Sequence, residues 1–182
     1  MLHLRTAYEK KGVEAYYQQN ALAYQNPHEE QVTELILRNA ERVDYSQALD
    51  LCAGGGEVSK VWKDLGHTNF LASDAYTHKL YAKKLKKPCA AYSFDDFLRG
   101  NFEFPHTFSS IVCSFALHLC PEEWLFTVTE NLFVYSPNIV IITPHKRPEL
   151  ENIGNCRLDF EDFVLTSRGK KVRLKSYIHT PF

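Results

Sequence analysis

Short apolar runs and amphipathic stretches alternate along most of this chain. The apolar runs have the length and composition of buried strands, and they predict strands over residues 46–51, 68–73, 89–94, 108–115 and 138–143. Before and between them, apolar residues recur at helical spacing, which predicts helices over residues 27–43, 57–65, 77–85 and 121–135. A tyrosine-rich stretch of helical character, residues 5–24, comes before the first of these.

The alternation of strand and helix predicts a mostly parallel sheet with helices on both faces. At the end of the chain two more strand patterns, 160–166 and 172–179, flank Ser167-Arg168-Gly169-Lys170 and predict an antiparallel hairpin. The expected fold is therefore α/β, Rossmann-like and doubly wound, with a mostly parallel seven-stranded sheet, a C-terminal antiparallel hairpin and N-terminal covering helices. We expect one domain, 1–182, in which residues 1–44 form a helical cap or lid and residues 45–182 form the core.

Composition narrows the class of protein. The formal charge of −1 predicts no bulk attraction to nucleic acid, so any such attraction must come from local basic runs. The five cysteines include no CxxC pair, which argues against a zinc site and a disulfide framework, and we expect no bound metal. No apolar run is long enough for a membrane span and the first residues lack the apolar core of a signal peptide, so we expect an intracellular protein, cytoplasmic or nuclear, with no membrane partner.

The most informative segment is the glycine turn that follows the strand ending near Asp50. Its sequence from residue 50 is Asp-Leu-Cys-Ala-Gly-Gly-Gly-Glu, and a helical pattern follows at once. Glycines let a ligand lie against bare backbone, and a helix N-terminus offers unpaired N–H groups. A phosphate-binding P-loop is excluded because no Lys-Ser or Lys-Thr follows the glycines. A dinucleotide site, as in a small dehydrogenase, is disfavoured because Ser59 stands where its third glycine belongs.

Acidic residues follow three successive predicted strands, and with the glycine turn they carry a family resemblance. Asp50, Gly54, Gly56, Asp74 and the pair Asp95-Asp96, together with the terminal hairpin, resemble the class I S-adenosylmethionine-dependent methyltransferases over residues 45–182. The chain departs from that family at Cys52, where glycine is more usual and where a positive φ would be strained. The resemblance implies S-adenosylmethionine as cofactor, a cation that suits carboxylates and backbone rather than lysine and arginine.

The resemblance also assigns roles to individual residues. It implies that Asp74 accepts hydrogen bonds from the ribose hydroxyls, that Asp95 or Asp96 accepts from the adenine amino group, and that Phe94 or Phe97 packs on the adenine ring. The full set of expected cofactor-binding residues is Asp50, Cys52, Ala53, Gly54, Gly56, Asp74, Ala75, Phe94, Asp95, Asp96, Phe97, Ser114 and Phe115. Taken singly, each acid could equally be a turn residue at a strand end.

The methyl acceptor is expected at the ends of strands 108–115 and 138–143. The stretch from Ser114 to His118 resembles a Ser-x-Ala-x-His stretch of methyltransferases that act on small molecules, and His118, with His145, is a candidate catalytic residue that could take a proton as a neutral imidazole. The alternative is that His118 caps a helix or packs under a loop. Lys146 and Arg147 could hold an anionic acceptor, or could belong to a solvated loop.

The N-terminal residues Tyr24, Asn26 and His28 could fold over the cofactor as a lid, or the aromatic ones could simply pack. We interpret two basic runs as solvated surfaces rather than nucleic-acid sites, because few aromatic residues stand among them. The runs are Lys79, Lys83, Lys84, Lys86 and Lys87, and Arg168, Lys170, Lys171, Arg173 and Lys175. The tetrapeptide Asn/Asp-Pro-Pro-Tyr/Phe of enzymes that methylate base amino groups is missing, which argues against methylation of such groups.

The expected function is methyl transfer to an O or N nucleophile of a small molecule, RNA or protein. The alternative is a cofactor-binding protein without catalysis, a sensor or a partner-dependent subunit.

Overall fold

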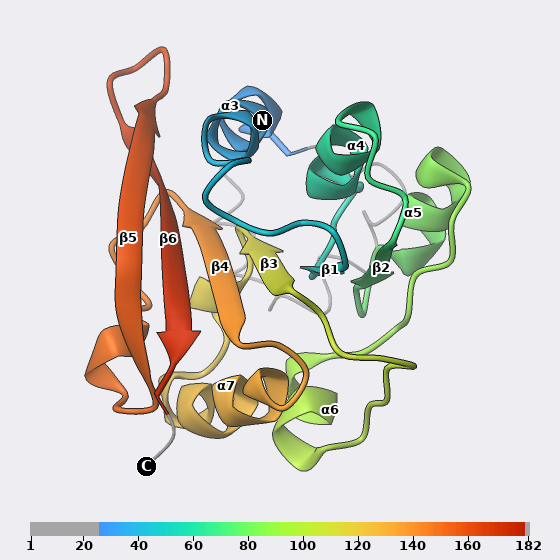
Figure 1. Ribbon diagram of the computed structural model, residues 1–182, viewed down its shortest axis with the longest axis vertical. Coiled ribbons are helices and arrows are strands. Elements are labelled where there is room, and N and C mark those ends of the chain that lie inside the picture. The colour runs from blue at the N-terminus through green and yellow to red at the C-terminus, as the bar shows by residue number, and fades with distance from the viewer. Residues whose placement is uncertain (1–25, 181–182) are drawn as a thin grey trace, which may run out of the picture.

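The computed structural model describes residues 26–180. Within that range one sheet has the strand order β2-β1-β3-β4-β6-β5, with helices packed on both faces (Figure 1). The strands are β1 (Ala48–Leu51), β2 (Phe70–Ser73), β3 (Ser110–Ser114), β4 (Asn138–Thr143), β5 (Cys156–Leu165) and β6 (Lys171–His179). The pairs among β2, β1, β3 and β4 are parallel, whereas β6 runs antiparallel to both β4 and β5. The fold is thus α/β and Rossmann-like with a mixed sheet.

The predicted strand over residues 89–94 is wrong. Only Ala90 pairs with β2, in a single parallel bridge to Ser73, and the chain then enters α6 (Phe94–Arg99). The reason is local, because Ser93 and Asp96 form a capping box in which each side chain accepts from the other residue's backbone N–H. The described part of the chain therefore has six strands rather than the seven expected.

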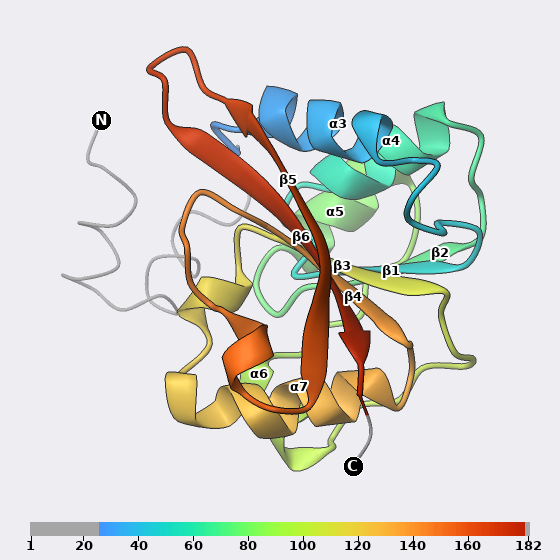
Figure 2. The same ribbon diagram turned by 60° about the vertical axis from the view of Figure 1, so that its left-hand side comes forward.

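Helices lie on both sides of the sheet (Figure 2), and an apolar layer fills the space between the sheet and the helices on each side. Helices α3 (Glu29–Arg38) and α4 (Glu57–Asp64) cover one face, and α6 and α7 (Leu125–Phe133) cover the other. Helix α5 (His78–Leu85) packs beside β2 through Tyr81 and Leu85. The parallel strands alternate between the two layers, since Leu49 and Ile111 belong to one and Ala48 and Val112 to the other.

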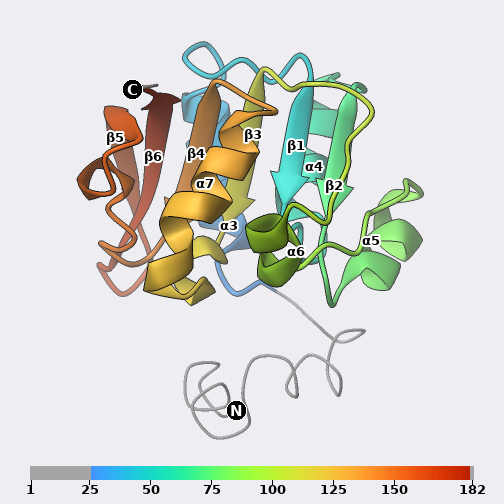
Figure 3. The same ribbon diagram turned by 90° about the horizontal axis from the view of Figure 1, so that it is seen from below.

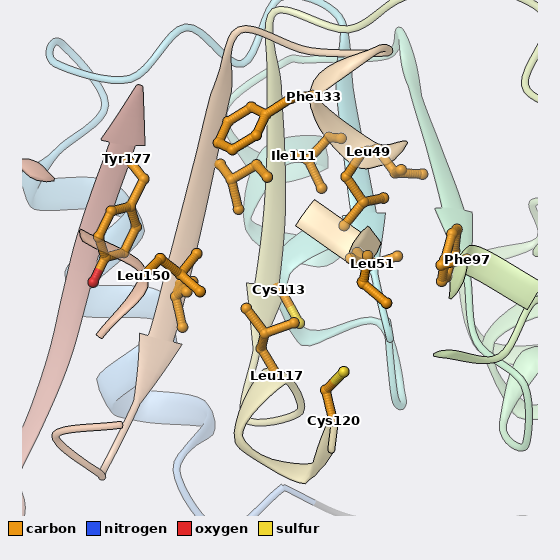
Figure 4. Packing of buried hydrophobic residues seen from close by; sticks show 14 of the residues in the cluster. Leu49, Leu51, Phe97, Ile111, Cys113, Leu117, Cys120, Phe133, Leu150 and Tyr177 are labelled. Atoms are coloured by element: carbon orange, nitrogen blue, oxygen red, sulfur yellow. The ribbon is translucent and has the colours of Figure 1, made fainter. Parts of the chain in front are cut away.

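The layer under α6 and α7 reaches the carboxyl ends of the strands (Figure 4). Cys113 on β3, Leu117 on the 3-10 helix η2 (Leu117–Leu119) and Cys120 beyond it are all buried there. The predicted helix 121–135 begins instead as the 3-10 helix η3 (Glu122–Trp124) and continues as α7. A further 3-10 helix, η4 (Leu150–Asn152), lies between β4 and β5.

The terminal hairpin is longer than its sequence pattern predicts and is fixed to α3. Asp162 on β5 accepts from Arg38 Nη2 at 3.0 Å and from Asn39 Nδ2 at 3.0 Å. Asn39 Nδ2 also donates to the carbonyl of Leu35, so this residue ends α3 earlier than the predicted limit of 43. The predicted helix 5–24 lies outside the described residues. Between residues 26 and 180, no helix combines the length and the apolar character that a bilayer crossing needs.

Candidate functional site

Four parallel strands bring the predicted site residues to one edge of the sheet. The strands β2, β1, β3 and β4 lie side by side and end at this edge (Figure 3), so the turns after them meet there. In open α/β sheets, ligands bind beyond the carboxyl ends of the strands, where the strand order reverses. Here that position is between β1 and β3, next to the glycine turn.

Asp50 carries a buried carboxylate that is only half satisfied. Its Oδ2 accepts from the backbone N–H of Ser59 at 3.1 Å and from the Ser59 hydroxyl at 2.6 Å. The Tyr81 hydroxyl donates in turn to Ser59 Oγ at 2.8 Å. Asp50 Oδ1 is buried and has no hydrogen-bond partner within the described residues. Burial raises the pKa of Asp50 well above its usual value, so this site favours either a proton or a cation beside the carboxyl group.

The turn after Asp50 uses left-handed backbone at three positions, with φ of 56° at Cys52, 58° at Gly54 and 88° at Gly56. Cys52 is therefore in the strained conformation anticipated for a residue with a Cβ. A Cβ on Gly56 would lie 2.4 Å from Leu85 Cδ2, so this glycine is needed for the close approach of α5. A hydrogen bond with Cys113, together with burial, raises the pKa of the Cys52 thiol, which makes it a poor nucleophile.

Asp74 holds the glycine turn in place. Its Oδ2 accepts from the Gly54 N–H at 3.0 Å, and its Oδ1 accepts from the N–H groups of Tyr76 and Thr77 at 2.8 and 2.7 Å. The Thr77 hydroxyl donates to the Gly54 carbonyl at 2.8 Å. We call these two hydrogen bonds, from Gly54 N–H to Asp74 and from Thr77 to the Gly54 carbonyl, the Gly54 clasp. The role of Thr77 has no signature in the sequence. The ribose role of Asp74 stays a prediction, and the clasp leaves the carboxylate only part of its accepting capacity.

The residues predicted to contact adenine lie in or beside α6, and their side chains have different surroundings. Phe97 is fully buried, with its ring centroid 4.7 Å from that of Phe102, so the prediction that it packs on a ligand is wrong. The capped start of α6 directs this side chain into the core. Asp96 accepts from the N–H and hydroxyl of Ser93, and Asp95 accepts from Arg99 Nε at 2.8 Å. Phe94 is half-buried at the start of α6. The adenine roles of Asp95, Asp96 and Phe94 stay predictions.

The two candidate catalytic histidines lie together. The rings of His118, in η2, and His145, after β4, are 4.6 Å apart between centroids and tilted by 52°. His118 Nδ1 is buried with no hydrogen-bond partner in the described part of the chain. Burial, and to a lesser degree the neighbouring His145, lowers the pKa of His118 to about 4. His118 is therefore a neutral imidazole at physiological pH, able to accept or donate a hydrogen bond but a weak base.

Of the three predicted lid residues, His28 reaches the end of β3 and Asn26 supports it. His28 stacks on Phe115, and the backbone N–H of His28 donates to Oδ1 of the buried Asn26 at 2.9 Å. Phe115 itself has a φ of 56°, which turns the chain sharply away from the strand after Ser114. Tyr24 lies outside the described residues. Ala53 and Ala75 line the turns after β1 and β2, where the Ala53 N–H donates to the Ser73 carbonyl at 3.1 Å.

The loop after β4 presents cations and rests on a buried lysine. Lys146 and Arg147 are exposed, and Arg147 makes an exposed ion pair with Glu122 at 3.8 Å. Lys175 on β6 is 4% exposed, and its Nζ donates to the Lys146 carbonyl at 3.0 Å. Sequence reasoning missed Lys175, because it stands in a basic run that is typical of a solvated surface. Among residues 26–180, no group of three or more His, Cys, Asp or Glu side chains is placed to hold a metal ion.

Several solved structures with a similar fold are methyltransferases crystallised with S-adenosylmethionine or S-adenosylhomocysteine. The chain is similar to magnesium protoporphyrin IX methyltransferase from Synechocystis PCC 6803, solved with bound S-adenosylmethionine, with a TM-score of 0.65 and 10% identity over 97% of this chain and 96% of that one. It is similar to the N-methyltransferase NodS from Bradyrhizobium japonicum WM9, solved with S-adenosylhomocysteine, with a TM-score of 0.67 and 15% identity over 91% of this chain and 98% of that one. The fold is that of the class I methyltransferases.

Sequence comparison alone is less informative. No family model matches the chain. It is 26% identical over 184 residues to the uncharacterized protein C17A5.05c of Schizosaccharomyces pombe, an alignment that covers 78% of this chain and 74% of that protein.

Proposed function

We propose that this protein is an S-adenosylmethionine-dependent methyltransferase. The observation that carries the proposal is the buried Asp50 Oδ1, an unpartnered carboxylate oxygen beside a left-handed glycine turn, at the same sheet edge as the His118–His145 pair. A buried carboxylate is costly unless a proton or a cation accompanies it. The methionine part of the cofactor carries an α-ammonium group, which would supply that positive charge.

The residues present fit the cofactor. Asp50 would accept from its ammonium group, the Cys52–Gly56 backbone would lie against its methionine part, and Asp74 has remaining lone pairs for a ribose hydroxyl. The cofactor would supply a methyl group on a positively charged sulfur, with its leaving group ready. The chain would then need chiefly to align the acceptor with that methyl group and to exclude water.

His118 and His145 would line the acceptor side of the site. His118 is neutral and its Nδ1 is buried without a described partner, so it would hold the acceptor by a hydrogen bond. The stacked pair His28 and Phe115 would close the same edge and shield it from solvent. The acceptor class remains open between a small molecule, RNA and a protein, and a partner subunit could supply part of its binding surface.

One observation favours a second candidate, a protein that binds the cofactor without transferring methyl. His118, one of the two candidate catalytic histidines, is a weak base because burial lowers its pKa. A sensor or a partner-activating subunit would need the binding residues alone.

Titration calorimetry and methyl labelling separate these candidates. We expect S-adenosylmethionine and S-adenosylhomocysteine to bind and NAD to show no heat, and a preference for NAD would contradict the cofactor assignment. Incubation with methyl-labelled cofactor and fractionated cell extract should place label in an acceptor. Binding without label in small molecules, RNA or protein would support the sensor instead.

A further inference from the structure

Lys175 is a buried lysine for which the described residues provide no carboxylate partner. It is 4% exposed, and its Nζ donates a hydrogen bond of 3.0 Å to the neutral carbonyl of Lys146. Within the described residues no Asp or Glu lies within ion-pair distance of it. A buried charge costs several kcal/mol unless it is paired. A neutral side chain could hold the Lys146 carbonyl without this cost.

The neighbours of Lys175 on the same face of β6 each have an acidic partner of their own. Arg173 Nε is 3.0 Å from Glu161 Oε1, and the Tyr177 hydroxyl donates to Glu151 Oε2 at 2.8 Å. Lys175 stands between them and has none. Glu161 lies directly across from Lys175 on β5, but its printed ion pair is with Arg173, so within the described residues the remaining two donors of the Lys175 ammonium are available to an anion.

Lys175 also lies where an acceptor would approach. It pairs with Ile141 near the carboxyl end of β4, and its Nζ reaches the loop that begins with His145. Lys146 and Arg147 add two exposed cations to the same loop, and the Glu122 contact of Arg147 is too exposed to neutralise it strongly. The edge beside His118 and His145 therefore gathers three cations.

The proposed methyl transfer suggests what the anion is. A hydroxyl or ammonium acceptor must lose a proton, and His118 is poorly suited to take it. A carboxylate is already a nucleophile at neutral pH and needs no base.

We propose that the acceptor is an ionised carboxylic acid, held by Lys175 with Lys146 and Arg147 and methylated on a carboxylate oxygen. An oxygen lone pair forms the bond to the methyl carbon, the S–CH3 bond breaks, and its electron pair stays on sulfur. The products are a methyl ester and S-adenosylhomocysteine, and no proton is transferred. The inference rests on the proposed methyltransferase function and names its acceptor class.

The lability of the methylated product in alkali tests the proposal that the acceptor is a carboxylate. The purified protein is incubated with S-adenosyl-[methyl-³H]methionine and the small-molecule, RNA and protein fractions of a cell extract, and each labelled product is treated with mild alkali. Methyl esters release the label as volatile methanol, whereas N-methyl groups and methyl ethers keep it. We expect volatile label. Alkali-stable label would overturn the carboxylate acceptor and leave the methyltransferase function standing, whereas bound cofactor with no label would overturn both.

Variants locate the anion site. Lys175→Met should lower ester formation roughly 10-fold or more, as expected for the loss of a charge-assisted contact, with cofactor affinity unchanged as a check of folding. Lys170→Met, in the exposed hairpin turn, is the matched control and should leave the rate unchanged. If Lys175→Met does not fold, the exposed double variant Lys146→Glu/Arg147→Glu must show the loss instead. Full ester formation by folded Lys175→Met, or by the double variant, would overturn the assignment.

Discussion

His28 stacks on Phe115 with ring centroids 5.0 Å apart and planes within 12° of parallel. The pair joins the residue before α3 to the residue after β3, which are 87 positions apart in the chain (115 − 28). It therefore holds the start of the described chain across the edge where the cofactor and acceptor are proposed to bind.

The stacking of His28 on Phe115 should be measurable by a double-mutant cycle. His28→Ala and Phe115→Ala should show a coupling of about 0.5–1.5 kcal/mol in the free energy of unfolding, as found for aromatic pairs. Urea denaturation of the four proteins measures it. Combining His28→Ala with Phe126→Ala, an exposed phenylalanine of α7 on the other face, should give additive effects. Additive effects for His28 and Phe115 as well would mean that the contact adds no stability.

The two left-handed glycines Gly56 and Gly66 form a matched pair, since both have a φ of 88°. Nothing lies within 4 Å of a Cβ on Gly66, so Gly66→Ala should cost only the backbone term of about 1–2 kcal/mol. Gly56→Ala adds the clash with Leu85 and should cost a further 1–3 kcal/mol, roughly the penalty of overpacking. Thermal unfolding of both variants gives the difference, and equal losses would contradict the close approach of α5.

Replacing Asp50 by Asn should change stability and cofactor affinity in opposite directions. The pKa of the folded Asp50 is raised, so its contribution to stability is present at low pH and is lost as the pH rises through that pKa. Asp50→Asn removes this loss, and the cofactor-free variant should unfold at a higher denaturant concentration than the wild type at neutral pH.

The same change removes the proposed partner of the cofactor ammonium group. Calorimetry should find S-adenosylmethionine affinity lowered by about 10-fold or more. Asp64→Asn, at an exposed helix end, is the control for the loss of one negative charge. Unchanged affinity in Asp50→Asn would contradict the assigned role.

His118 should make the protein less stable in mild acid. Its pKa is lowered from 6.5 to about 4 in the folded state, so its contribution is complete above pH 6.5 and is lost as the pH falls towards 4. Between pH 7 and pH 5 the wild type should lose about 2 kcal/mol more than His118→Gln. Denaturation of both proteins at the two pH values tests this. An equal pH dependence would mean that His118 takes up protons freely in the folded protein.

The sequence predicts the structure correctly where one local signal dominates. The β-branched run of β4 and the glycine turn after Asp50 left few alternatives, and His118 and His145 could be brought together because parallel strands end at one edge. The apolar run over residues 89–94 resembles a strand, but the Ser-x-x-Asp capping box that begins at Ser93 starts a helix there instead.

Lys175 could not be found from the sequence for a different reason. Strand β6 is covered on both faces over residues 174–177, so its alternation does not reveal which charged side chain is buried. Phe97 was misassigned because the direction of its ring depends on where α6 begins.

The Gly54 clasp has a consequence for how a ligand is received. Asp74 and Thr77 fix both the N–H and the carbonyl of Gly54, and so the peptide groups on both sides of this residue, which leaves the turn little to order when a ligand arrives. The conformational entropy of this loop is lost during folding, so ligand binding does not have to offset that loss. Association at the turn should therefore follow lock-and-key kinetics, with a rate set by diffusion into the site rather than by a slow loop rearrangement.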